Sequence, residues 1–152
     1  DIMSRVAPSG PIYQAGTLSG NPLAVAAGLA TLELLDEPAY LRLGAYTERL
    51  ADGLREAASQ SAHAVQVVSK PGLLTVFFSE RPVASFDDAR ACDLDAYAAW
   101  CRGLLSRGVY PPPSQFEAWF PSLAHTQEQL EHTLAAAAAA FASLLEPPDA
   151  AR

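Results

Sequence analysis

Residues 10–24 read GPIYQAGTLSGNPLA, and this stretch organises the interpretation of the rest of the chain. Its first part is rich in Gly, Pro and Ser, which are typical of turns and loops. Asn21 and Pro22 then begin a helix, because Asn caps free backbone N–H groups and Pro suits the first helical position. Small residues, hydroxyls and exposed N–H groups just before a helix suit an anion such as phosphate. Ordinary turns and helix caps use the same residues, so composition alone leaves both interpretations open.

Helical and extended patterns alternate downstream of this stretch. We predict helices over residues 22–35, 39–59 and 94–107, and a last helix that starts at the capping-box sequence Thr126-Gln127-Glu128-Gln129. We predict strands over 64–68, 73–79, 109–110 and 117–120, and a polar connection over 80–88. The helix at 22–35 is apolar on nearly every side, which predicts a helix buried all round or packed between two domains.

The composition restricts the class of protein. A chain of 152 residues is about one domain, and with 50% hydrophobic and 18% charged residues it is not disordered as a whole. The net charge of -7 argues against a nucleic-acid partner and against docking on an anionic membrane. No apolar run approaches the ~20 residues that cross a bilayer. The two cysteines exclude a disulfide framework, so a reduced, cytoplasmic chain is the default expectation.

The two ends of the chain carry different signals. Residues 1–4, DIMS, contain no starting Met and no secretory signal, so the opening resembles the middle of a longer protein. Residues 146–152, EPPDAAR, are typical of a natural end, because prolines stop a helix and a short polar tail follows.

The histidines and cysteines give no site of their own. The histidines lack metal-ligand spacing, which favours solvated or core roles over metal binding, and we predict no metal site; they are His63, His125 and His132. Cys92 and Cys101 are more typical of small hydrophobic residues than of nucleophiles.

Lys70 and Glu117 carry more information. Lys70 is the only lysine and precedes Pro71 in a turn, so a reaction that needs a buried Schiff-base lysine must obtain it elsewhere. Glu117 lies among aromatic residues, where a desolvated carboxylate would be active in proton transfer. The competing interpretation, which the chemistry alone favours, is an exposed Glu at the start of a strand.

Two blocks of this sequence resemble the glutamate-1-semialdehyde 2,1-aminomutase family, within the class III group of pyridoxal-phosphate aminotransferases. In the first block, residues 10–24, the pattern Gly-Thr-x-x-Gly-Asn-Pro is that of the wider group, and YQAGTLS at 13–19 narrows it to the aminomutase. The second block comprises RGVY at 107–110, PSQFEA at 113–118 and AHT at 124–126, and is similar to the family's C-terminal signature. The resemblance covers essentially the whole chain but only the C-terminal third or so of the family protein.

The resemblance implies an α/β fold of the aspartate-aminotransferase type (fold type I). This chain would hold the small C-terminal domain, a small sheet packed with helices, preceded by an interdomain helix and a loop left over from the large cofactor domain. The implied division is residues 1–21 for the phosphate-contact loop, 22–60 for interdomain helices and 61–152 for the small domain.

The resemblance also implies a function and its residues. The family isomerises glutamate-1-semialdehyde to 5-aminolevulinate for tetrapyrrole (porphyrin) synthesis, as a cytoplasmic homodimer with pyridoxal phosphate. Gly16 and Thr17 match the turn whose threonine contacts the cofactor phosphate of the neighbouring subunit. Glu117 matches a glutamate near the substrate amino groups, and Tyr13 would face the same cavity. The Schiff-base lysine, the ring-nitrogen aspartate and the substrate-carboxylate arginine would lie upstream, so this chain alone is predicted to be inactive and free of cofactor.

The sequence departs from the family pattern at two places, and two alternative functions remain open. Residues 71–75, PGLLT, lack the family's usual Gly-Ser/Thr-Met, which puts the local strand packing and the substrate fit in question, and Pro111-Pro112 replaces a more varied pair. One alternative is a fragment of another class III aminotransferase, which uses an external amino acceptor. The other is a catalytically dead module that only dimerises.

Overall fold

The structure is a computed structural model that describes residues 1–144, so the predicted tail at 146–152 lies outside the described residues. The chain divides into two compact units, Asp1–Asp36 and Glu37–Arg152, and each is described by itself. Within residues 1–144, every helix is too short or too polar to span a bilayer.

The first unit consists of a loop and one helix. A short 3-10 helix, η1 (Met3–Arg5), and a parallel bridge between Val6 and Ile12 precede an extended segment and a turn. Helix α1 (Pro22–Leu34) follows, close to its predicted bounds, and none of its residues is buried. Of the two environments predicted for this helix, burial on all sides is not found within the first unit, and packing between two domains stays a prediction.

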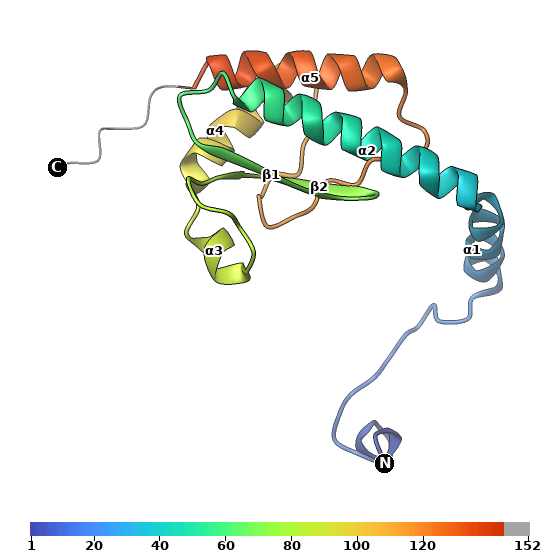
Figure 1. Cartoon of the computed structure of the whole chain (residues 1–152). Coiled ribbons are helices and arrows are strands. Elements are labelled where there is room, and N and C mark those ends of the chain that lie inside the picture. The colour runs from blue at the N-terminus through green and yellow to red at the C-terminus, as the bar shows by residue number, and fades with distance from the viewer. Residues whose placement is uncertain (145–152) are drawn as a thin grey trace. The chain divides into compact units, whose positions relative to one another are not determined.

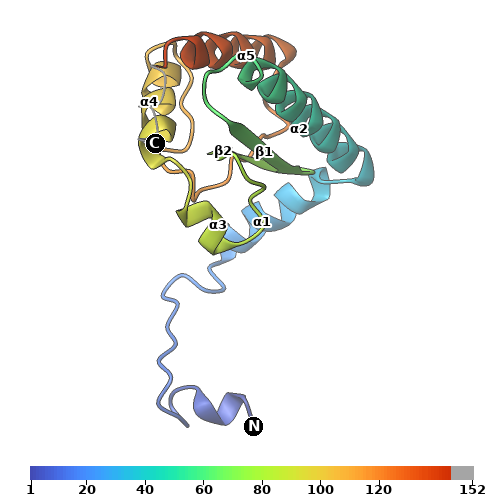
Figure 2. The same cartoon turned by 60° about the vertical axis from the view of Figure 1, so that its left-hand side comes forward.

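The second unit is a small α/β domain. Its elements, in chain order, are α2 (Glu37–Ala58), β1 (Val65–Lys70), β2 (Leu73–Phe78), α3 (Phe86–Arg90), α4 (Leu94–Leu105) and α5 (Gln127–Ala142). Helix α5 packs against both α2 and α4, and the β1–β2 sheet packs under them, with α3 at the end of the sheet away from α5 (Figures 1 and 2). This arrangement confirms the predicted small sheet packed with helices.

The sheet is one antiparallel hairpin. Its register runs from Val65 opposite Phe78 to Lys70 opposite Leu73. Between the strands lie Pro71 and Gly72, and Gly72 has φ 85°, which suits the third position of a type II turn. The hairpin therefore forms in spite of the departure at residues 71–75.

The core forms where the sheet meets α4 and α5. Trp100 is fully buried and stacks on Phe141 with ring centroids 4.9 Å apart and on Trp119 at 5.8 Å. Leu74 and Leu104 are also fully buried in this cluster. Trp119 joins the core through a single antiparallel bridge to Leu74, with Trp119 N donating to Leu74 O at 2.7 Å.

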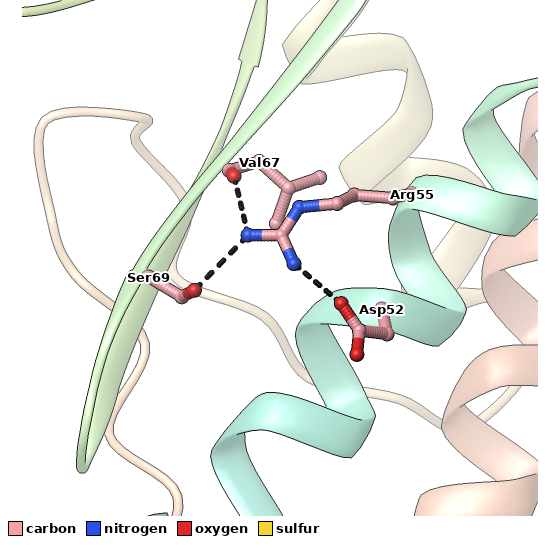
Figure 3. Close-up of polar contacts among 4 residues, drawn as sticks. All are labelled: Asp52, Arg55, Val67 and Ser69. Carbon is pink, nitrogen blue, oxygen red and sulfur yellow. Dashed lines mark hydrogen bonds and ion pairs between the residues drawn. The ribbon is translucent and has the colours of Figure 1, made fainter.

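A polar link connects α2 to the sheet on the surface. The Arg55 guanidinium donates to the Val67 carbonyl at 2.9 Å, to Ser69 Oγ at 3.0 Å and to Asp52 Oδ1 at 2.6 Å (Figure 3). The ion pair itself is exposed and contributes little to stability. The link fixes how α2 lies along β1, since one side chain bonds both elements.

The structure corrects the predictions around the hairpin. No strand forms at 109–110, and at 117–120 only Trp119 pairs, because three prolines at 111–113 remove backbone donors and a turn follows them. The predicted polar connection over 80–88 contains the start of α3, which Ser85 and Asp88 cap reciprocally. Helix α2 packs on β1 and α5 within the second unit, and its assignment to the interdomain helices stays a prediction.

Candidate functional site

The loop before α1 is a tight turn that contains two glycines, Gly16 and Gly20. Ser19 N donates to Gly16 O at 2.9 Å, and Asn21 N donates to Leu18 O at 3.0 Å. A Cβ on Gly16 would lie 2.1 Å from Ser19 Oγ, and Gly20 has φ 74°. A side chain at Gly20 would therefore strain the turn, whereas one at Gly16 would displace the Ser19 hydroxyl.

Hydrogen-bond donors remain free in this turn. Thr17 is exposed, and within the described residues its hydroxyl and its N–H have no hydrogen-bond partner. The helix end behind the turn is already capped, because Asn21 Oδ1 accepts from Leu23 N and Ala24 N, both at 3.1 Å. The donors available to an anion therefore belong to the turn and not to the first turn of α1. A compact turn with a free hydroxyl and free N–H groups fits the phosphate of pyridoxal phosphate.

Tyr13 precedes this turn in extended backbone. Its side chain is 83% exposed, and it makes no hydrogen bond or ring contact to the part of the chain that the structure describes. The structure thus brings Tyr13, Gly16 and Thr17 together on one loop of the first unit. Their predicted common cavity with Glu117 stays a prediction, because Glu117 belongs to the second unit.

Glu117 ends a turn between the proline run and the core. Its N–H donates to Ser114 O at 3.1 Å, and Phe116 N donates to Ser114 Oγ at 3.2 Å. The Glu117 side chain is exposed, and it stands two residues before the buried Trp119. The structure therefore places Glu117 in a turn rather than at the start of a strand, with its carboxylate open to solvent in this chain.

Hydrogen bonds of two buried polar side chains hold the Glu117 turn against the rest of the domain. The Tyr97 hydroxyl donates to Pro112 O at 3.0 Å, and Gln115 Nε2 donates to Ala89 O at 2.6 Å. Burial raises the pKa of Tyr97 well above its ordinary value, so this hydroxyl stays a donor. Gln115 is 2% exposed. No local sequence pattern indicates this role for Gln115, because its partner lies 26 residues away on a helix that the sequence did not predict.

The remaining candidate residues have structural surroundings. Burial raises the pKa of the Cys92 and Cys101 thiols, so both stay protonated at neutral pH and are poor nucleophiles. Lys70 is exposed at the end of β1. His125 Nδ1 accepts from Ser122 N at 2.9 Å, and its ring packs 5.9 Å from that of Tyr46. Among the described residues, no group of three or more His, Cys, Asp or Glu side chains has the arrangement of a metal site.

Two surface clefts formed by described residues of the second unit contain none of the predicted site residues. One, of about 450 Å³, lies between the sheet end and α3 and includes His63, Arg81 and Asp93. The other, of about 160 Å³, is lined mainly by aromatic and proline side chains, among them Tyr46 and Phe120. Glu117 lies outside both clefts.

Comparison with solved structures defines the class of fold. An omega-transaminase from Sphaerobacter thermophilus matches with a TM-score of 0.71 and 24% identity, over 93% of this chain and 33% of that one. A transaminase with PLP bound matches with a TM-score of 0.70 and 25% identity, over 92% and 32%. The chain thus has the fold of the C-terminal third of fold-type-I aminotransferases, as predicted.

Comparison with curated sequences narrows this class. The glutamate-1-semialdehyde 2,1-aminomutase of Anaeromyxobacter sp. (strain K) is 54% identical over 142 residues, which are 93% of this chain and 33% of the relative. The chain spans about one third of the length of the curated relatives it matches. No family model matches it. The chain is therefore homologous to one third of glutamate-1-semialdehyde 2,1-aminomutase, and the resemblance of the two sequence blocks is confirmed.

Proposed function

We propose that this chain supplies the C-terminal third of a glutamate-1-semialdehyde 2,1-aminomutase that acts as a homodimer. The observation that carries the proposal is the 54% identity to such an enzyme over 142 residues. In the proposed reaction the amino group of glutamate-1-semialdehyde moves to the adjacent aldehyde carbon, and a ketone remains where the amine was. The product, 5-aminolevulinate, is an isomer of the substrate, so no external amino donor, acceptor, oxidant or reductant is consumed.

The proposed cofactor is pyridoxal phosphate, which when bound serves as the electron sink for the bond changes at the substrate carbons. Gly16 keeps the turn compact, and the Thr17 hydroxyl donates a hydrogen bond to the phosphate held mainly by the neighbouring subunit. The free donors of the turn support this role. The covalent lysine is proposed to lie outside this chain, because Lys70 is exposed at the hairpin end.

Glu117 is proposed to accept hydrogen bonds from the substrate amino groups and to hold a proton at its carboxylate during the exchange. Tyr13 is proposed to line the substrate cavity next to the phosphate turn. Both side chains are exposed in this chain, which leaves them accessible to a substrate. The remainder of the enzyme would then exclude water from them, so that the carboxylate acts in a drier environment than it has here.

A second candidate is an aminotransferase that passes the amino group to an external keto acid. It is favoured by the structural neighbours, which are described as transaminases. Their identities of 24% and 25% are less than half of the 54% shared with the aminomutase, so the sequence favours isomerisation.

The deciding experiment uses the full-length protein with glutamate-1-semialdehyde and no added keto acid. We expect 5-aminolevulinate to appear at a rate that an added keto acid does not raise. Product that forms only with an external acceptor would instead identify an aminotransferase. A folded full-length protein that converts glutamate-1-semialdehyde neither with nor without an added keto acid would support the catalytically dead dimerisation module. The same assay on the 152-residue chain alone is expected to give no product.

A further inference from the structure

Gln115 is a buried amide in the middle of the turn that carries Glu117. Its side chain is 2% exposed, and Nε2 donates to the carbonyl of Ala89 on α3 at 2.6 Å. The turn is held at both flanks, by Tyr97 on Pro112 at 3.0 Å and by the backbone bridge of Trp119 to Leu74. Between these two anchors, Gln115 provides the buried hydrogen bond from the turn to the rest of the domain among the described residues.

This amide is an unfavourable choice for packing alone. Gln115 Oε1 is buried and has no hydrogen-bond partner within the described residues. An apolar side chain of the same size would avoid the desolvation cost of that oxygen. Helix α3 does not depend on the bond either, since Ala89 O also accepts from Cys92 N at 3.4 Å. The hydrogen bond of the Gln115 amide therefore restrains the turn rather than stabilising α3.

The geometry points to a positioning role: we propose that Gln115 fixes the turn so that the Glu117 carboxylate faces the substrate. The inference rests on the proposed function of Glu117. Gln115 lies inside the turn that Glu117 N closes on Ser114 O, so an anchored Gln115 fixes the backbone from which Glu117 projects. Another side-chain contact of this turn with α3 is the Phe116–Phe86 ring pair at 5.8 Å, whose rings are 47% and 68% exposed. An exposed pair is a weaker restraint than a buried hydrogen bond, because water competes for its surfaces.

The test is Gln115→Met, which keeps the length and volume of the side chain and removes the amide. In the full-length protein we expect kcat to fall about 10- to 100-fold, the loss typical of a reacting group displaced by about 1 Å, with KM changed less than about threefold. We also expect hydrogen exchange of the backbone amides at 115–118 to accelerate about tenfold while α5 is unchanged, both in the 152-residue chain and in the full-length protein.

The matched control is Thr47→Val. Thr47 is 1% exposed, and its hydroxyl makes two hydrogen bonds, to Leu43 O at 2.8 Å and from Gly72 N at 3.2 Å, neither of which involves the Glu117 turn. It is expected to leave both kcat and the exchange of the turn unchanged. An equal effect of Thr47→Val would overturn the proposal, because general destabilisation would then explain both variants.

A double-mutant cycle shows whether Gln115 acts through Glu117. In a Glu117→Gln background, adding Gln115→Met should change kcat by less than about threefold, since the group to be positioned is gone. A loss as large as in the wild-type background would overturn the positioning role, as would unchanged kcat and unchanged exchange in a folded Gln115→Met protein. If Gln115→Met does not fold, Gln115→Leu takes its place. A full-length protein without aminomutase activity refutes the proposed function, and the exchange measurement still decides whether Gln115 holds the turn.

Discussion

Thr17 offers a direct test of the proposed phosphate contact, because its hydroxyl has no hydrogen-bond partner within residues 1–144. The side chain is exposed, and the described residues provide no partner for its hydroxyl. Thr17→Val removes this donor and keeps the β-branched shape. The stability of the chain should therefore change by less than about 0.5 kcal/mol, as for an ordinary surface substitution.

The cofactor affinity should respond much more strongly. A hydrogen bond to a charged group contributes about 1.5–3 kcal/mol. Since about 1.4 kcal/mol is tenfold, the Kd for pyridoxal phosphate should rise about 10- to 100-fold in the full-length protein. The measurement is a titration of the cofactor-free protein, followed by the absorbance of bound cofactor, with thermal unfolding as the check on folding.

Two control variants make this test specific. Thr31→Val removes a hydroxyl that donates within α1, to Ala27 O at 2.8 Å, and should leave the Kd unchanged. Thr17→Ser keeps the hydroxyl and should retain most of the affinity. A wild-type Kd in folded Thr17→Val would refute the phosphate contact, and an equal loss in Thr31→Val would show that the effect is not local.

Glu117→Gln should lower turnover by about 100-fold or more with cofactor affinity intact, measured as 5-aminolevulinate formation, and wild-type turnover would return Glu117 to a structural role. The hydrogen bond from Ser85 and those from the Ala84 and Ser85 backbone hold the pKa of Asp88 below its ordinary value. The stability that this cap gives α3 should therefore be complete above the ordinary aspartate pKa and vanish as the pH falls through the lower folded pKa. Amide exchange in α3 should report this pH dependence in the wild-type chain and should lose it in Asp88→Asn. A wild-type chain whose α3 exchange shows no such pH dependence would contradict the capping argument. The 152-residue chain alone should show a light-scattering mass above 16.1 kDa, because α1 exposes Leu29 and Leu32 by 58% and 64%, and Leu29→Glu should lower that mass; a stable monomer would contradict this. The same chain should give no saturable absorbance with pyridoxal phosphate that depends on Lys70, and a specific Lys70 adduct would overturn its predicted inertness.

Local signals predicted the elements that local interactions form. Thr126 caps α5 and bonds reciprocally with Gln129, as its capping box indicated. Gly108 has φ 80° after α4, and Asp93 caps the start of that helix. In each case the residue and its partner lie within about one helical turn of each other, so the sequence contains the whole interaction.

The missed features depend on short or distant partners. Helix α3 has 5 residues, too few for a hydrophobic stripe, although the capping-box pattern Ser85-x-x-Asp88 indicates a helix start. The predicted strand at 117–120 reduces to one bridge between Trp119 and Leu74, which are 45 positions apart in the numbering. From its sequence position in a polar loop, Gln115 is expected to be exposed, and its burial depends on the packing of α3 against the turn. These contacts could not be predicted because they depend on which segments meet in the folded domain.

Solvent exposure of the candidate residues gives a physical reason to expect that this chain alone is inactive. Thr17 and Glu117 are both exposed in this chain, so water competes for every hydrogen bond that they offer. The same bonds become much stronger in a water-excluded site, where the effective dielectric constant is lower. An apolar helix with no buried residue follows directly after the phosphate turn, and its burial would exclude water beside that turn. We therefore predict that a surface that covers α1 would also exclude water from the Thr17 turn and so strengthen the hydrogen bond that Thr17 is proposed to donate.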